Sequence, residues 1–117
     1  MEQNIKAGLL QDKSMPNNST LLQLDSNVLN KASHTLRAVA HPLRYHMLRL
    51  IHEEKYINVT EIYLKMGLEQ TTVSQHLAIL RENGFVLTQR EGKCIFYTVN
   101  YERLEEVDAL VTQLIRE

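Results

Sequence analysis

The chain lacks most features that would place a protein in a membrane or in an oxidising compartment. It has a single cysteine, Cys94, among 117 residues, so no intrachain disulfide can form. No apolar run is long enough to span a bilayer, and the N-terminus lacks the hydrophobic stretch and cleavage site of a signal peptide. These absences predict a cytoplasmic protein without a membrane partner, and the length suits a single core.

The motifs of common enzyme classes are also missing. No glycine-rich phosphate loop follows a predicted strand, no nucleophile elbow appears, and no cysteine and histidine have the spacing of a catalytic pair. The acidic side chains near the C-terminus fit the solvated face of a helix. The sequence therefore predicts a protein that is not an enzyme and that needs no cofactor.

The net charge is close to zero, but the charges are unevenly distributed. Residues 31–56 carry five basic and two acidic side chains, whereas residues 100–117 carry two basic and five acidic side chains. A net charge of −1 alone would argue against a nucleic-acid partner. Because the acidic side chains gather at the C-terminal end, the middle of the chain remains free to face an anion.

Two regions are expected. Residues 1–24 are polar and irregular, and they predict a tail that is flexible or that extends a dimer interface. Residues 25–117 predict one domain that begins with a helix from Asp25 or Ser26. The sequence "AHP" at 40–42 ends that helix, and Pro42 begins a second one that runs to about Glu54.

A short helix and a turn come next. "YINV" at 56–59 is compatible with one short strand. Asn58 and Glu61 have the spacing of a capping box, which predicts a helix over 59–66. Gly67 is placed to end that helix, because glycine readily adopts the left-handed conformation of a helix C-terminus.

The next predicted helix, about 70–83, has two different faces. Val73, Leu77 and Leu80 form one narrow apolar stripe. Thr71, Ser74, Gln75 and Ala78 fall on the opposite side, which is short, polar and nearly uncharged, unlike the lysine and glutamate of an ordinary solvated face. Such a face suits close approach to base edges in a DNA major groove. The predicted DNA-binding residues are Gln70, Thr71, Thr72, Ser74 and Gln75. The alternatives are a polar surface helix or a winged helix that binds only proteins.

A hairpin is predicted directly after this helix. Residues 85–100 fit two strands joined at Glu91-Gly92, a dipeptide that favours a two-residue turn. Arg90 and Lys93 flank the turn, where they could reach DNA phosphates as the tip of a wing. Basic residues at a hairpin tip can also serve only to keep an edge strand soluble.

These segments resemble the ArsR/SmtB family of bacterial repressors. The matching stretches are "LRAVAHPLRYHMLRLI" (36–51), "VTEIYLKMGLEQTTVSQHLAILRENGFV" (59–86) and "REGKCIFYTV" (90–99). The resemblance implies a mainly α winged helix-turn-helix fold with about five helices and a small β-hairpin wing. It also implies a homodimeric transcriptional repressor that releases double-stranded operator DNA when a signal changes. Glu69 departs from the pattern, because Ser or Thr usually precedes the recognition helix.

The C-terminal segment predicts a helix capped by Asn100. Its apolar residues recur at steps of three and four, like a coiled-coil seam, and the resemblance places the last helix in the dimer interface. The alternative is that the stripe packs on its own domain. The predicted interface residues are Leu104, Val107, Val111 and Leu114.

The inducing signal is not evident from the sequence. The family's Cys-x-Cys metal pair would fall in "VTEIYL", which has no cysteine, and the last helix has no histidine. His46 and His52 are six residues apart, so they do not converge on one point of a helix, and no metal site is predicted. The alternative is a site between subunits that uses His34 or His41. His76 is interpreted as a buried hydrogen-bonding residue. Cys94 is interpreted as a buried strand residue, with a redox-responsive regulator as the alternative.

Overall fold

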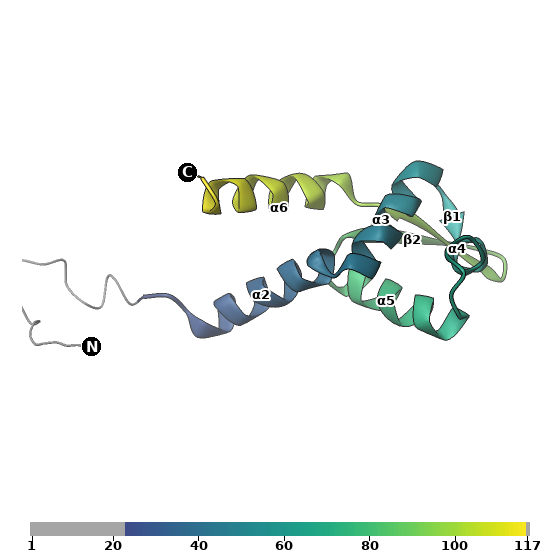
Figure 1. Ribbon diagram of the computed structural model, residues 1–117, viewed down its shortest axis with the longest axis horizontal. Coiled ribbons are helices and arrows are strands. Elements are labelled where there is room, and N and C mark those ends of the chain that lie inside the picture. The colour runs from purple at the N-terminus through teal and green to yellow at the C-terminus, as the bar shows by residue number, and fades with distance from the viewer. Residues whose placement is uncertain (1–22, 117) are drawn as a thin grey trace, which may run out of the picture. The chain divides into compact units, whose positions relative to one another are not determined.

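The computed structural model describes residues 23–116 (Figure 1). The predicted tail over 1–24 therefore lies almost entirely outside the described residues. Five helices and a three-stranded sheet occur among residues 23–116, which confirms the predicted winged helix-turn-helix class. The order is α2 (Ser26–Ala40), α3 (Pro42–Glu54), β1 (Ile57–Asn58), α4 (Val59–Met66), α5 (Gln70–Glu82), β2 (Val86–Glu91), β3 (Cys94–Val99) and α6 (Tyr101–Leu114).

The described residues fall into two units that divide within α2, after Ala32. In the first unit, the Asp25 carboxylate accepts a hydrogen bond from the Asn27 backbone N–H at 2.8 Å. This bond satisfies one of the free N–H groups at the start of α2. Val28 and Leu29 are both exposed.

The second unit, Ser33–Glu117, contains the hydrophobic core. Helices α3, α4 and α5 and the sheet each contribute side chains that are almost wholly removed from water, and Phe85 is the largest of them. The α5 stripe predicted from the sequence lies in this core. The buried residues are Ala38, Met47, Leu48, Ile51, Ile57, Ile62, Val73, Leu77, Leu80, Phe85, Val86 and Val99.

The junction between α2 and α3 is held by side chains on both sides of it. Pro42 is the first residue of α3, and the His41 ring Nδ1 accepts a hydrogen bond from the Leu43 N–H at 3.1 Å. Arg44 Nε donates to the Ala38 carbonyl at 2.8 Å. The predicted break at 40–42 is confirmed, and the bond between Arg44 and Ala38 fastens α3 to the end of α2.

The sheet is antiparallel, with strand order β1-β3-β2. The predicted hairpin is present, but its turn lies one residue later than expected. Glu91 pairs with Cys94, so the two turn residues are Gly92 and Lys93. Gly92 has φ of 64°, and glycine suits the first position of a hairpin turn because that position requires a positive φ.

The end of α5 is fastened to the start of α6, and we call this set of contacts the α5–α6 joint. Asn100 Nδ2 donates to the Gly84 carbonyl at 2.9 Å, and Arg103 Nε donates to the Asn83 carbonyl at 3.1 Å. Asn100 also caps α6 by accepting from the Arg103 N–H. Gly84 has φ of 82°, and a Cβ there would lie 3.4 Å from Arg103 Nε. The joint therefore depends on glycine at this position.

Candidate nucleic-acid interface

Local capping fixes α4 and the turn that follows it. The Asn58 side chain accepts from the Glu61 N–H at 2.9 Å, and the Glu61 carboxylate accepts from the Asn58 N–H at 3.2 Å. This reciprocal pair is the predicted capping box. Gly67 ends α4 with φ of 68°, in the left-handed conformation. The chain can then turn and begin α5 at Gln70 within three residues.

Helix α5 separates its apolar and polar residues. Val73, Leu77 and Leu80 have no exposed surface, which fixes the rotation of the helix on the core. Four of the five predicted DNA-binding residues are exposed, and Thr72 is half-buried. We call the exposed set the polar face, and it consists of Gln70, Thr71, Ser74 and Gln75.

Both predicted wing residues are exposed near the hairpin tip. Lys93 is a turn residue, and Arg90 is in the last part of β2. A hollow of about 350 Å³ lies between the start of α5 and the wing. Gln70 and Ser74 line one side of it, and Lys93 and Cys94 line the other. The structure thus brings Gln70 and Ser74 of the polar face together with Lys93 of the wing, whereas Thr71, Gln75 and Arg90 do not line this hollow.

A brace that sequence reasoning missed contacts the wing near its tip. The Tyr56 hydroxyl donates a hydrogen bond to the Glu91 carboxylate, and this bond raises the pKa of Tyr56 to about 12. The Tyr56 ring also stacks on Phe96, with centroids 4.5 Å apart and planes 4° apart. These contacts join residues 35 and 40 positions apart, so no local pattern could reveal them.

His76 connects the recognition helix to α3. Its Nδ1 lies 3.2 Å from Arg44 Nη1, and its ring centroid lies 5.2 Å from that of His41. Its hydrogen-bonding role is confirmed, although the residue is half-buried and not fully buried. Burial lowers the pKa of His76, and the positive charge of Arg44 and the neighbouring His41 lower it further.

Arg81 is a further basic residue on α5 that the sequence analysis did not assign. It is exposed in the last turn of the helix, ten residues after Thr71 and three after Ala78. At about 100° per residue, these steps place it at the edge of the face that holds those two residues. Its charge acts on Tyr97 of β3, where it opposes the rise in pKa that burial causes. Arg81 therefore lies near enough to β3 for its charge to act on that strand.

Cys94 and the histidines are the remaining candidate site residues. Cys94 is exposed, so its interpretation as a buried strand residue is wrong. The reason is its place at the first position of β3, beside the turn. A redox role for Cys94 stays a prediction. Within residues 23–116, His, Cys, Asp and Glu side chains do not gather in a group of three or more that could hold a metal ion.

The apolar side chains of helix α6 are more buried near its start than near its end. Leu104 and Val107 are half-buried and pack against the core of their own chain. Val111 is half-buried, whereas Leu114 is 71% exposed. The predicted dimer stripe is thus covered near its start and open near its end. Leu110 and Ile115 add two more exposed apolar side chains there.

The short helix, glycine turn, recognition helix and basic-tipped hairpin together define a winged helix-turn-helix DNA-binding protein. The family model described as "Bacterial regulatory protein, arsR family" matches residues 41–88. The transcriptional repressor PagR of Bacillus anthracis is 36% identical over 80 residues, which cover 68% of this chain and 79% of PagR. The biofilm growth-associated repressor of Xylella fastidiosa is 34% identical over 84 residues, covering 71% and 73% of the two chains.

A solved structure of HlyU from Vibrio cholerae has a TM-score of 0.60 and 30% identity, covering 80% of this chain and all of that one. The chain belongs to the ArsR family and is a DNA-binding transcriptional regulator. Regulators of this family bind operator DNA and are generally dimeric, and they are not enzymes. No helix in the described part of the chain has the length and hydrophobicity needed to cross a membrane.

Proposed function

We propose that this chain is a cytoplasmic, homodimeric repressor that binds operator DNA with its polar face and wing and releases it when a signal changes. Residues 25–117 form the DNA-binding and dimerisation domain. The observation that carries the proposal is the exposed, uncharged polar face of α5 beside Lys93 of the wing. The named repressors among the relatives support repression as the direction of control.

The polar face is suited to base contacts because its side chains are polar and uncharged. Gln75 is exposed and can bond an adenine edge with both its donor and its acceptor. Thr71 and Ser74 allow the helix backbone to come close to the groove. Thr72 is half-buried, so it offers DNA less surface than its neighbours.

The wing residues and Arg81 supply positive charge at the edges of this surface. Arg90 and Lys93 have long, exposed side chains, which suit phosphate contacts that position the protein. Glu69 is the acidic residue that directly precedes the polar face in the sequence. In the described structure its side chain does not cap α5. Its charge is favourable at the start of a helix, but it adds repulsion near a phosphate.

Dimerisation is proposed through α6. The interface includes Leu104, Val107, Val111 and Leu114. The half-buried Val111 and the exposed Leu114 are in direct contact across it. Leu104 and Val107 support the interface from the core side. The exposed apolar residues at the end of α6 support this proposal, because such a stripe on a small domain requires a cover.

A pair of isosteric substitutions tests the DNA interface. Gln75→Glu places a negative charge on the polar face, whereas Gln113→Glu makes the same change on α6. Fluorescence anisotropy would use the duplex upstream of the protein's own gene and a scrambled duplex. Gln75→Glu should weaken binding to the upstream duplex by about ten-fold or more, because like charges would meet at the groove.

The control should retain affinity within about two-fold, since screening limits the reach of an exposed charge to roughly 10 Å. Equal losses in both variants would contradict the assignment of α5 to the interface. So would an unchanged affinity in Gln75→Glu.

A further inference from the structure

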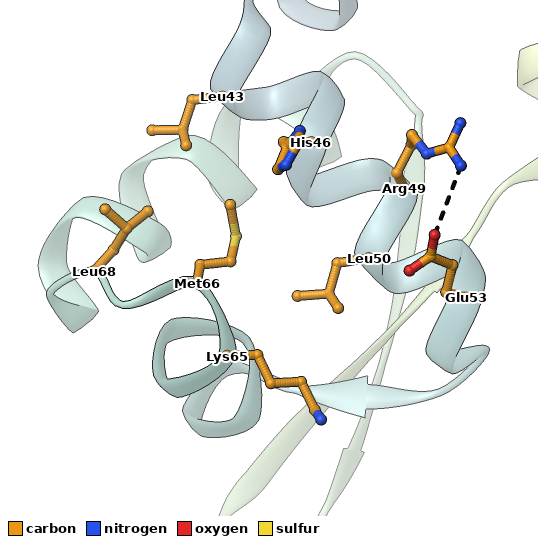
Figure 2. Close-up of a pocket in the computed structure, with 8 residues that line it drawn as sticks. All are labelled: Leu43, His46, Arg49, Leu50, Glu53, Lys65, Met66 and Leu68. Atoms are coloured by element: carbon orange, nitrogen blue, oxygen red, sulfur yellow. Dashed lines mark ion pairs between the residues drawn. The ribbon is translucent and has the colours of Figure 1, made fainter.

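A second hollow lies between α3 and the end of α4 (Figure 2). Its volume is about 460 Å³, within the range of roughly 300–1,000 Å³ that is usual for small-molecule sites. It shares no residue with the polar face or the wing. Its lining residues are Leu43, His46, Arg49, Leu50, Glu53, Lys65, Met66 and Leu68.

The floor of this pocket is apolar. Leu43 and Leu50 come from α3, Met66 from the end of α4, and Leu68 from the turn before α5. All four are half-buried, and Leu50 and Met66 extend into the space between the two helices (Figure 2). The methionine side chain is unbranched and polarisable, so it can adapt to ligands of different shape. The floor therefore suits a hydrocarbon or aromatic body.

The rim of the pocket carries more positive than negative charge. Arg49 and Lys65 line it, against the single acid Glu53. Arg49 Nη2 lies 3.6 Å from a Glu53 oxygen, and both side chains are 59% exposed. Lys65 Nζ lies 3.8 Å from a Glu54 oxygen, and these side chains are 50% and 41% exposed. Arg49 also has a side-chain hydrogen bond with Tyr45. Long, exposed ion pairs contribute little stability, so the pairs with Glu53 and Glu54 oppose the turn of either cation to an incoming anion only weakly.

We propose that this pocket binds a small amphipathic molecule with an apolar body and one carboxylate, and that its occupancy lowers affinity for DNA. The body lies on the four apolar side chains, and the carboxylate meets Arg49 and Lys65. The effect on DNA rests on the proposed function. It follows from the position of Met66 and Leu68, which belong to the segment that sets the angle between α4 and the recognition helix.

Octanoate is the probe for the binding site, and octanamide is its uncharged counterpart. Methyl NMR on the full chain without DNA would follow the signals of Leu43, Leu50, Met66 and Leu68. Octanoate should shift these signals in a saturable manner, and octanamide should bind about ten-fold more weakly, because it cannot form charge-assisted hydrogen bonds. Shifts spread over other residues, or equal affinity for both probes, would overturn the proposed ligand class.

Substitutions at the rim of the pocket test whether its cations bind the carboxylate of octanoate. The double change Arg49→Gln with Lys65→Gln should lower octanoate affinity about ten-fold, whereas Arg49→Lys should retain most of it. Lys55→Gln is the matched control, because Lys55 is an exposed cation at the end of α3 that does not line the pocket. A loss of affinity in Lys55→Gln equal to that of the double variant would show that only net charge matters, and would overturn the site.

The coupling to DNA is measured separately by anisotropy of the protein–DNA complex. Saturating octanoate should weaken binding of the upstream duplex by about five-fold or more, the lower end of typical coupling between sites. The double variant should bind DNA without octanoate and lose the octanoate effect. Octanoate binding with unchanged DNA affinity would overturn the coupling alone. Absence of DNA binding in all conditions would refute the proposed function and the coupling, while the NMR result would still decide the ligand class.

Discussion

Helices α5 and α6 are nearly equal in length, with 13 and 14 residues, but they meet the rest of the protein differently. Helix α5 buries Val73, Leu77 and Leu80 completely. Helix α6, within its described span Tyr101–Leu114, buries no side chain fully. One helix is therefore fixed in rotation by its own domain, whereas the other still has an apolar side to be covered.

Their exposed faces also differ. The polar face of α5 is free of charge, whereas α6 exposes the acidic residues Glu102, Glu105, Glu106 and Asp108. An acidic helix is repelled by the phosphates of DNA, but it can lie against an apolar stripe of a second copy with its acids in water. The side chains that a helix leaves exposed thus indicate the partner of that helix more clearly than the spacing of its apolar residues does.

The largest expected difference between the two helices is in stability. Leu77→Ala should lower the free energy of unfolding by about 2–5 kcal/mol, because it opens a cavity in a closed core. Leu110→Ala makes the same change at a side chain that is 66% exposed, and it should cost less than about 0.5 kcal/mol. Urea unfolding at low protein concentration measures both. A large decrease in the free energy of unfolding for Leu110→Ala that does not depend on protein concentration would contradict this difference between α5 and α6.

The second difference concerns self-association. Leu114→Asp places a charge on the exposed apolar end of α6, and it should raise the dimer dissociation constant by about ten-fold or more. Gln113→Glu adds a charge to a neighbouring polar position of the same helix, and it should change that constant little. Sedimentation equilibrium provides the measurement. A wild-type protein that stays monomeric at micromolar concentration would refute the α6 interface.

The third prediction separates α5 from the wing. Gln75→Ala should reduce discrimination between the upstream and scrambled duplexes by about 1–3 kcal/mol, because it removes a base contact. Lys93→Ala should weaken binding to both duplexes similarly and should flatten the salt dependence by roughly one unit per wing. Anisotropy at several salt concentrations would measure both effects. If only Lys93→Ala removes the preference for the upstream duplex, the two roles are reversed.

The smallest expected effect is a dependence of stability on pH through His76. Its pKa in the folded protein lies below the value of 6.5 expected for the unfolded chain. The unfolded state therefore binds a proton first as the pH falls, and the free energy of unfolding should decrease below about pH 6.5. His76→Gln removes this titrating group while keeping a polar side chain. Urea unfolding from pH 7.5 to 5.5 should show a smaller decrease in this variant.

The elements that the sequence predicted well are those with local signals. Pro42, the Asn58–Glu61 capping box and Gly67 each act within a few residues, and the structure begins or ends helices at these points. The polar and apolar sides of α5 follow from helical spacing alone. These residues were sufficient to predict the helix-turn-helix unit and the position of its exposed face.

The features that were missed depend on long-range contacts. The pairing of β1 with β3, the brace between Tyr56 and Glu91, and the pocket between α3 and α4 join residues that are distant in sequence. Periodicity also could not show that Leu104 and Val107 pack on their own core while Leu114 does not. A repeating apolar stripe has the same sequence pattern whether its own domain or a second copy of the chain covers it.

The α5–α6 joint has a mechanical consequence for a dimer built through α6. A helix of 14 residues is about 21 Å long, so each recognition helix is held at the end of a rigid arm. A tilt of about 10° at the joint would move the far end of that arm by about 4 Å, more than one base-pair step of roughly 3.4 Å. In such a dimer, the contacts of Asn83, Gly84, Asn100 and Arg103 would set the distance between half-sites, although none of these residues need touch DNA.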